Sequence, residues 1–144
     1  METPTMGRVT VAARIENIFD LYEVERGRLK PEQVRRVEVT DALVDTGATM
    51  LSLPKRLVAQ LGLSLVRSRQ ARTSAGPTTL RVYDLVCLTV QGREYKGEVA
   101  EVPDDCPVII GQVPLELLDF VVDPAGQRLI GNPEHGGEQM IDMY

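Results

Sequence analysis

The sequence predicts a single, mainly β domain that closes or folds on itself, and three observations predict it. Short apolar or alternating segments recur along the chain, with turn residues between them. No long segment carries the periodicity of an amphipathic helix. A chain of 144 residues has the length of one domain and can bury a real core. Many short strands in one small domain favour a closed sheet, because closure limits the number of open edges.

The N-terminal part is expected to contain two strands joined by an irregular segment. Apolar and polar residues alternate over 9–16, which predicts a half-buried strand. Residues 17–33 are less regular, because Gly27 and Pro31 interrupt them. We expect a long hairpin connection there, with a short helical turn around 19–22. The next strand begins at Val37 and continues into an apolar stretch.

A short helix is expected after residue 53. Pro54 fits the start of a helix, where its missing N–H has no partner to lose. Leu57 and Leu61 lie four residues apart and therefore share one helical face. Gly62 is typical of the residue that ends a helix.

The middle of the chain predicts a polar segment followed by an antiparallel pair of strands. Residues 63–66 are a candidate strand, and 67–79 are polar and small. Alternation returns over 80–90, and Gln91-Gly92 is a turn. The strand over 93–102 carries charged residues on one face, which indicates that this face is solvated.

The last part predicts one buried strand, a second helix and a hairpin. Residues 108–110 are fully apolar and read as a core strand after a turn at 104–107. Pro114 is expected to open a short helix. Residues 120–122 and 128–130 are two strands around a turn. We divide the chain into an N-terminal tail (1–8), one domain (9–133) and a C-terminal tail (134–144), irregular at first and then a candidate interface strand.

The most informative stretch is ALVDTGAT, residues 42–49. An apolar run fits a buried strand, and this one ends by placing the carboxylate of Asp45 at the strand terminus. The hydroxyl of Thr46 can donate or accept a hydrogen bond. Gly47 permits a tight backbone path. The pattern indicates a rigidly held carboxylate near a mouth or an interface, although the tripeptide alone is more often an ordinary strand exit.

A second motif, PVIIG at residues 107–111, follows about sixty residues later. Together the two motifs resemble the retropepsin family, the single-domain aspartic proteases, in a bacterial-type form, over residues 37–133. The resemblance implies a retropepsin-like closed β-barrel with one or two short helices. In that fold the strand that carries Asp-Thr-Gly and the strand that ends at Gly111 lie side by side, and a helix follows.

The resemblance also implies site residues. Asp45 would be the catalytic carboxylate, Thr46 would lock the two active-site loops together across a dimer, and Gly47 would lend backbone groups. A polar hairpin near 72–76 would be the flap that closes over substrate, with 80–84 as the strand that leaves it. The residues expected to contact substrate are Ala48, Thr49, Thr73, Ser74, Ala75 and Gly76. Gln112 departs from the residue usual in relatives.

An aspartic protease needs two carboxylates close together, and this chain holds one Asp-Thr-Gly. Asp41, Asp104, Asp105 and Asp123 lack the following Thr-Gly. The single copy implies a two-fold homodimer in which the two Asp45 side chains meet on the axis. The expected function is peptide-bond hydrolysis on a peptide or protein substrate, and the strands expected at the dimer interface are 10–15 and 140–144. The alternative is a non-catalytic homodimeric module, for dimerisation or peptide binding, on the same fold.

Composition excludes several other classes. The net charge of −5 argues against a nucleic-acid partner, because phosphate binding needs a basic face. No apolar run is long enough to cross a membrane, and no signal segment is evident, so a cytoplasmic location is expected. Cys87 lies in an apolar strand and reads as a reduced core residue, with a disulfide to Cys106 as the alternative. Zinc would have too few ligands, so we expect no metal and no cofactor.

Overall fold

The computed structural model describes residues 8–123 and 125–140, and within them the chain is mainly β, as predicted. Seven strands form one sheet in the order β1-β2-β7-β3-β6-β5-β4, and β8 pairs with β9 separately. The strands are β1 Val9–Asn17, β2 Arg36–Val44, β3 Leu51–Pro54, β4 Leu65–Thr73, β5 Gly76–Val90, β6 Arg93–Val102, β7 Ile109–Ile110, β8 Phe120–Asp123 and β9 Arg128–Gly131.

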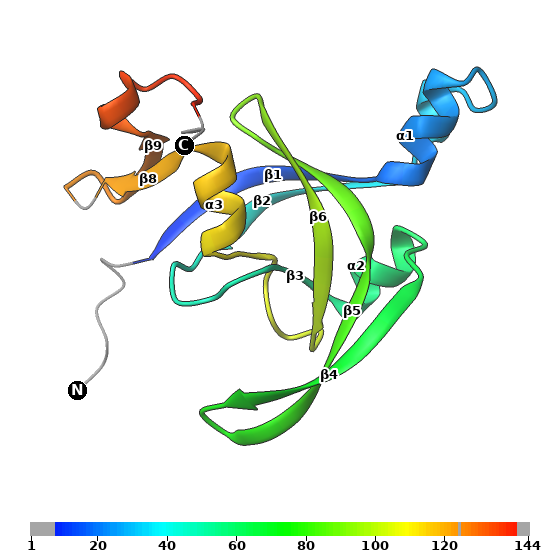
Figure 1. Cartoon of the computed structure of the whole chain (residues 1–144), viewed down its shortest axis with the longest axis horizontal. Coiled ribbons are helices and arrows are strands. Elements are labelled where there is room, and N and C mark those ends of the chain that lie inside the picture. Colours follow the sequence, from blue (N-terminus) through cyan, green and yellow to red (C-terminus); the bar gives the residue numbers. More distant parts are fainter. Residues whose placement is uncertain (1–7, 124, 141–144) are drawn as a thin grey trace.

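The large sheet closes on itself. β1 pairs with β2 along its length and with β5 over residues 14–17, so six of the strands form a ring around the core (Figure 1). β4 pairs only with β5 and extends outward from this ring. Strands on all sides of the ring contribute side chains with no exposed area: Ile15, Leu51, Val86, Leu88 and Ile110. Closure leaves few open strand edges, and for this reason a closed sheet was predicted from the many short strands.

The two sequence motifs lie side by side, as the resemblance implies. β2 and β7 pair in parallel, with Leu43 opposite Ile109 and Val44 opposite Ile110. β3 pairs with the other edge of β7, antiparallel. The strand that leads into Asp45 and the strand that returns after it are therefore both fixed to β7.

The structure contains three α-helices among the described residues, so the prediction of one or two short helices was wrong. Helices α2 (Lys55–Gln60) and α3 (Gln112–Leu118) correspond to the two expected ones. Gly62 has φ +67, in the left-handed region that favours glycine, and ends α2 as predicted. The additional helix is α1 (Ile18–Glu25), where we expected only a helical turn within a hairpin connection.

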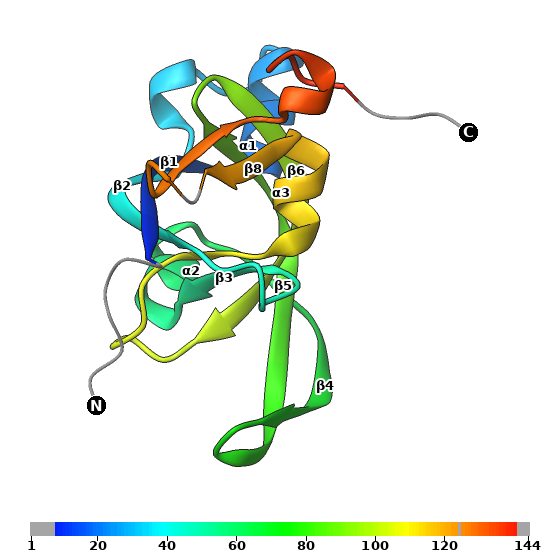
Figure 2. The same cartoon turned by 90° about the vertical axis from the view of Figure 1, so that its left-hand side faces the viewer.

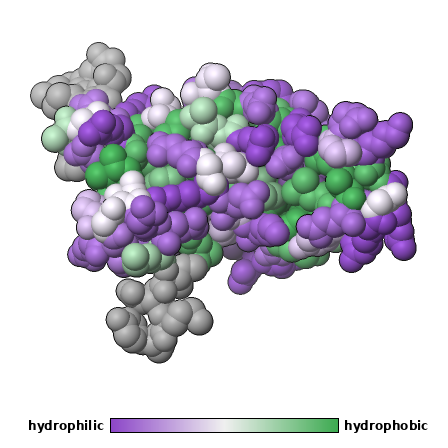
Figure 3. Space-filling view, turned by 90° about the horizontal axis from the view of Figure 1, so that it is seen from above, coloured by the Kyte–Doolittle hydropathy of each residue, from purple (hydrophilic) through white to green (hydrophobic). Residues whose placement is uncertain are grey.

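Helix α1 is stabilised by a local cap at its start and by a residue that is distant in the sequence. The Asn17 side chain caps the helix by accepting from the backbone N–H groups of Phe19 and Asp20. Asp20 in turn accepts three hydrogen bonds from Arg35, at 2.9, 2.9 and 3.0 Å. Apolar side chains gather on the surface at this end of the molecule, where Phe19 is half exposed (Figure 3). The apolar side chains of α1 are not all buried on one face of the helix. The sequence therefore lacks the helical periodicity that would have predicted it.

The polar segment over 67–73 belongs to a regular strand, which makes the expected hairpin longer than predicted. β4 pairs with β5 from Leu65 to the tip at Thr73 and Gly76. Most side chains of β4 are exposed on both faces, so the strand lacks an alternating apolar pattern. The hairpin projects away from the ring in both views of the molecule (Figures 1 and 2).

The C-terminal tail was predicted to be irregular at first, from residue 134, and this was wrong for its first residues. A 3-10 helix spans Pro133–His135, and the Asn132 side chain caps it. His135 lies 2.5 Å from the Asp119 carboxylate, which also accepts from the backbone of Met140. The hydrogen bond from His135 lowers the pKa of Asp119 below its usual value. Of the expected interface strand over 140–144, all but Met140 lies outside the described residues.

The other expected interface strand, residues 10–15, is already part of the ring. Thr10 pairs with Leu43 of β2, while Arg14 and Ile15 have strand partners on both edges. Within the described part of β1, residues 9–13 have a neighbouring strand on one edge, whereas residues 14–17 have one on both edges.

Both cysteines are free thiols, Cys87 buried and Cys106 half buried. Burial among apolar neighbours raises the pKa of Cys87 to about 11, so this thiol is unreactive. None of the helices in the described residues has the length and apolar character needed to span a bilayer.

We predict that Asp20→Asn lowers the free energy of unfolding at neutral pH by about 1 kcal/mol, because Arg35 is half exposed and solvent screens the pair. The hydrogen bonds from Arg35 hold the pKa of Asp20 below its usual value. The pair therefore stabilises the fold above the ordinary Asp pKa, and this contribution is lost as the pH falls below it. Urea titrations at several pH values measure this. A difference between wild type and Asp20→Asn that stays constant down to pH 2 would contradict it.

Candidate active site

Asp45 is the first residue of the loop between β2 and β3. Its backbone N–H donates to the carbonyl of Ile110 at 3.0 Å, which continues the β2–β7 pairing by one residue. The carbonyl of Asp45 accepts from the N–H of Ala48 at 3.1 Å, so the chain turns at once. The hydrogen bond to β7 thus fixes the N–H of Asp45, and the tight turn fixes its carbonyl group.

The Asp45 carboxylate is half buried and has one hydrogen bond among the described residues. The N–H of Gly47 donates to Oδ1 at 2.9 Å. A Cβ added at Gly47 would lie 3.2 Å from the same oxygen, so glycine allows the backbone to approach the carboxylate. Oδ2 has no hydrogen-bond partner in residues 8–123 or 125–140, which leaves one oxygen available to a second group.

Gly111 lies against the loop backbone. A Cβ at this position would come within 2.6 Å of the Met50 carbonyl oxygen, and within 2.8 Å of the Ala48 carbonyl oxygen. The backbone angles of Gly111 are ordinary ones (φ −85, ψ −175), so the requirement for glycine is steric rather than conformational. The N–H of Gly111 donates to the Met50 carbonyl at 3.1 Å.

The start of α3 holds the same loop. The N–H groups of Gln112 and Val113 donate to the carbonyls of Ala48 (2.8 Å) and Thr49 (3.1 Å). The first N–H groups of a helix have no acceptor inside the helix, and here the carbonyl groups of the loop are their acceptors. This explains why α3 begins two residues before Pro114, where the sequence predicted its start. It also explains why Gln112 is tolerated, because its backbone contacts the loop while its side chain contacts Glu116.

The predicted site residues form two groups. Asp45, Thr46, Gly47, Ala48 and Thr49 follow one another on the loop, with Ala48 half buried and both threonines exposed. The Thr46 hydroxyl makes no hydrogen bond within the described part of the chain. No hydrogen bond or ion pair joins this loop to the hairpin tip, where the second group lies.

The second group is the turn between β4 and β5. The Thr73 hydroxyl donates to the carbonyl of Gly76 at 2.7 Å and accepts from the N–H of Ala75 at 3.2 Å. Gly76 has φ +111, a backbone conformation that L side chains rarely adopt. Ser74 is exposed at the tip. The turn therefore has a defined shape although all four residues are small.

A bidentate ion pair anchors the base of this hairpin. Both terminal nitrogens of Arg67 in β4 donate to the Glu98 carboxylate of β6, at 2.9 and 2.7 Å. The pair raises the pKa of Arg67 and lowers that of Glu98, as expected for two opposite charges in contact. The hairpin is thus tied to the ring at one end, and its tip carries no such pair.

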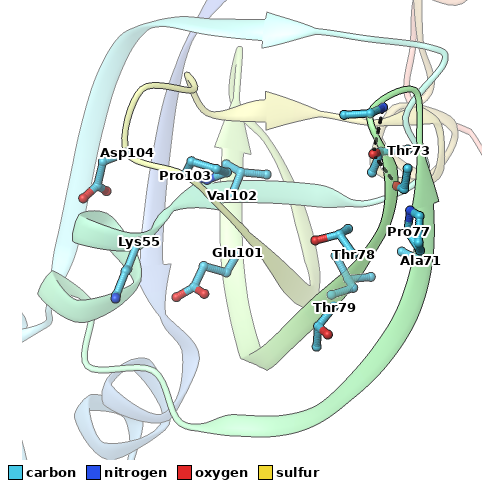
Figure 4. A pocket seen from close by; sticks show the side chains of 13 residues that line it. Lys55, Ala71, Thr73, Pro77, Thr78, Thr79, Glu101, Val102, Pro103 and Asp104 are labelled. Atoms are coloured by element: carbon cyan, nitrogen blue, oxygen red, sulfur yellow. Dashed lines mark hydrogen bonds between the residues drawn. The ribbon is translucent and has the colours of Figure 1, made fainter.

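A cavity of about 600 Å³ lies under the hairpin and does not include Asp45. It is bordered by the hairpin from residue 71 to 80, by residues 101–104 and by Lys55 (Figure 4). The candidate catalytic carboxylate and this cavity are therefore separate features of a single chain. Among the described residues, no group of three or more His, Cys, Asp or Glu side chains is arranged to hold a metal ion.

Sequence reasoning missed the groups that hold the loop. The motif at residues 107–111 indicated a core strand, but nothing indicated that Gly111 and the N–H groups of Gln112 and Val113 contact the loop backbone. Backbone donors leave no trace in residue identity. The glycine at position 111 was the one residue whose identity could have pointed to a close approach of two backbones.

Comparisons with known proteins point to one family. The sequence model of a family described as Aspartyl protease matches residues 33–118, which include the Asp45 loop, the hairpin, and Gly111. A search of the curated proteins found no match.

We predict that Gly111→Ala destabilises the protein by about 1–3 kcal/mol, since the new Cβ meets backbone atoms that cannot move independently. Gly126→Ala is the control, because a Cβ there lies in an exposed turn and would meet only the side chains of Asp123 and Arg128. Thermal unfolding of both variants measures the effect. Equal stability of Gly111→Ala and wild type would contradict the close approach.

Proposed function

We propose that this chain, which belongs to an aspartyl protease family of the retropepsin-like clan, is a homodimeric aspartic endopeptidase on a closed retropepsin-type barrel. The observation that supports the proposal most strongly is the Asp45 carboxylate. It stands at the end of a buried strand and is half exposed, with one hydrogen bond from Gly47 and one oxygen without a partner in the described residues. A carboxylate fixed in this way is half of a catalytic pair.

In the proposed reaction, the Asp45 carboxylates of two subunits share one proton. Two like charges at hydrogen-bond distance cannot both ionise, so one carboxyl group keeps its proton. The ionised one removes a proton from a water molecule, which attacks the carbonyl carbon of the peptide bond. The protonated one donates to the carbonyl oxygen, where negative charge develops. Activity should therefore fall at a pH where both carboxylates ionise.

The dimer is proposed because a single chain supplies one Asp-Thr-Gly. The exposed Thr46 hydroxyl, which has no partner in the described residues, is suited to a hydrogen bond with the other subunit's loop. Two-fold symmetry would make this contact reciprocal and bring the two Asp45 side chains together. One Asp45 cannot act as acid and base at the same time, so the proposal requires association.

The remaining predicted residues are assigned to substrate binding. Ala48 and Thr49 follow Asp45 on the loop and would line the cleft. The turn at Thr73, Ser74, Ala75 and Gly76 would act as the tip of a flap that covers the peptide and excludes water. An extended peptide between the flap and the loop would make main-chain hydrogen bonds, as an added strand does. The proposal includes a cytoplasmic location, with which the free thiols agree.

We predict that Asp45→Asn abolishes peptide cleavage while leaving the fold and the dimer intact. Asp41→Asn is the matched control, because Asp41 is exposed on β2, the strand that leads into Asp45, and lacks the Thr-Gly sequence. Both variants and wild type are incubated with a diverse peptide mixture from acid to neutral pH, and cleavage is read by mass spectrometry. Cuts by Asp45→Asn at the wild-type rate would contradict the proposal. The absence of cuts by the dimeric wild type would favour the non-catalytic module.

We also predict that Thr46→Val raises the dissociation constant of the dimer by about tenfold, since it removes a hydrogen bond at the interface and leaves its partner unsatisfied. Thr49→Val makes the same chemical change three residues along the loop and should leave the constant near that of wild type. Sedimentation equilibrium measures both. An unchanged constant for Thr46→Val would remove this residue from the interface.

A further inference from the structure

The hairpin β4–β5 is basic, although the whole protein has a net charge of −5. Residues 65–81 contain Arg67, Arg69, Arg72 and Arg81, and they contain no Asp or Glu. Positive charge is thus concentrated on the element that borders the cavity of about 600 Å³. Charge of one sign on one element of an oppositely charged protein favours a ligand of opposite sign.

Two of the four arginines are already paired. Arg67 binds Glu98, and Arg81 lies 3.3 Å from Glu101, which also accepts from the Tyr83 hydroxyl. Arg69 and Arg72 are exposed and have no hydrogen-bond or ion-pair partner in residues 8–123 or 125–140. Their charges remain available to a ligand.

The two unpaired arginines lie on opposite faces of the hairpin. Side chains of alternate residues share a face of a strand, so Arg69 lies on the same face as Ala71 and Thr73. Ala71 and Thr73 border the cavity, and so does Leu80, the residue opposite Arg69 in the pairing of β4 with β5. Arg72 belongs to the other face. Arg69 does not itself line the cavity, but it is the unpaired cation on the face of the hairpin that borders it.

The opposite wall of the cavity supplies a second unpaired cation. Lys55 of α2 borders the cavity across from Thr78 and Thr79 of β5, with Glu101 between them (Figure 4), and its ammonium group has no partner within the described chain. The two acidic residues at the cavity already have cationic partners. Glu101 is paired with Arg81, and the Asp104 carboxylate lies 3.8 Å from the guanidinium group of Arg56 and also accepts from the backbone N–H of Arg56 at 2.8 Å.

We propose that this cavity binds the carboxylate side chain of an aspartate or glutamate in the peptide substrate, a specificity that rests on the proposed function. Lys55 and Arg69 would pair with the carboxylate, and the hydroxyl of Thr78, which lies opposite Ala71 on the same face as Arg69, would donate to it. Because the cavity does not include Asp45, the acidic side chain belongs to a residue that flanks the scissile bond. The substrate class is therefore an extended acidic peptide segment.

The test measures binding to Asp45→Asn protein, so that cleavage does not interfere. Two pools of labelled decapeptides share an apolar central pair and carry either Glu or Gln at the flanking positions. We expect the Glu pool to bind about tenfold more tightly at low salt, with the difference shrinking as salt is added. Lys55→Gln and Arg69→Gln should each reduce the preference about threefold, and Arg72→Gln, on the other face, should leave it unchanged.

Equal affinity for the two pools, or an equal loss in Arg72→Gln, would overturn the inference. So would a single-stranded oligonucleotide of matched charge that binds more tightly than the Glu pool, because the basic face would then select any polyanion.

Wild-type cleavage of the same pools separates the two proposals. Cleavage of both pools with equal kcat/KM overturns the acidic preference alone, whereas cleavage of neither contradicts the proposed function while the binding comparison still decides the specificity.

Discussion

The backbone of Gly111 lies against the loop that follows Asp45, and the position of the candidate catalytic carboxylate depends on this approach. The carbonyls of Ala48, Thr49 and Met50 accept hydrogen bonds from three successive N–H groups at the start of α3. A side chain at position 111 would separate the two segments. With the segments in contact, the last turn of the loop, the first turn of the helix and strand β7 form one rigid unit beneath Asp45. Rigid support of this kind holds a catalytic group in place before substrate arrives.

In the proposed dimer, this unit supplies half of a site. Within the described residues the Asp45 carboxylate accepts one hydrogen bond, from Gly47, and Thr46 is exposed. The cavity under the hairpin is bordered by other residues, so one chain holds a carboxylate and a binding space that are not joined. A second copy related by a two-fold axis would supply the second carboxylate and the other wall of a cleft. As the flap that we propose, the hairpin would be fixed at its base by Arg67 and Glu98, and no ion pair holds its tip among the described residues.

The sequence predicted the parts of this arrangement that depend on residue type. The apolar run before Asp45 and the apolar residues before Gly111 indicated buried strands, and β2 and β7 are paired neighbours in the sheet. Three features could not be predicted, because they depend on partners far away in the chain. Helix α1 is stabilised by Asp20 and Arg35, α3 begins early because the loop supplies acceptors, and His135 is held by Asp119. The length of the hairpin was underestimated, since a strand exposed on both faces has no alternating pattern.

In the proposed enzyme, two subunits share one catalytic site. The most direct test is the rate of peptide cleavage per subunit as a function of protein concentration, with the fraction of dimer determined by sedimentation under the same conditions. We expect the rate per subunit to rise in proportion to the fraction of dimer and to vanish in the monomer. A rate per subunit that stays constant while the protein dissociates into monomers would contradict it, because a lone Asp45 would then be sufficient for catalysis.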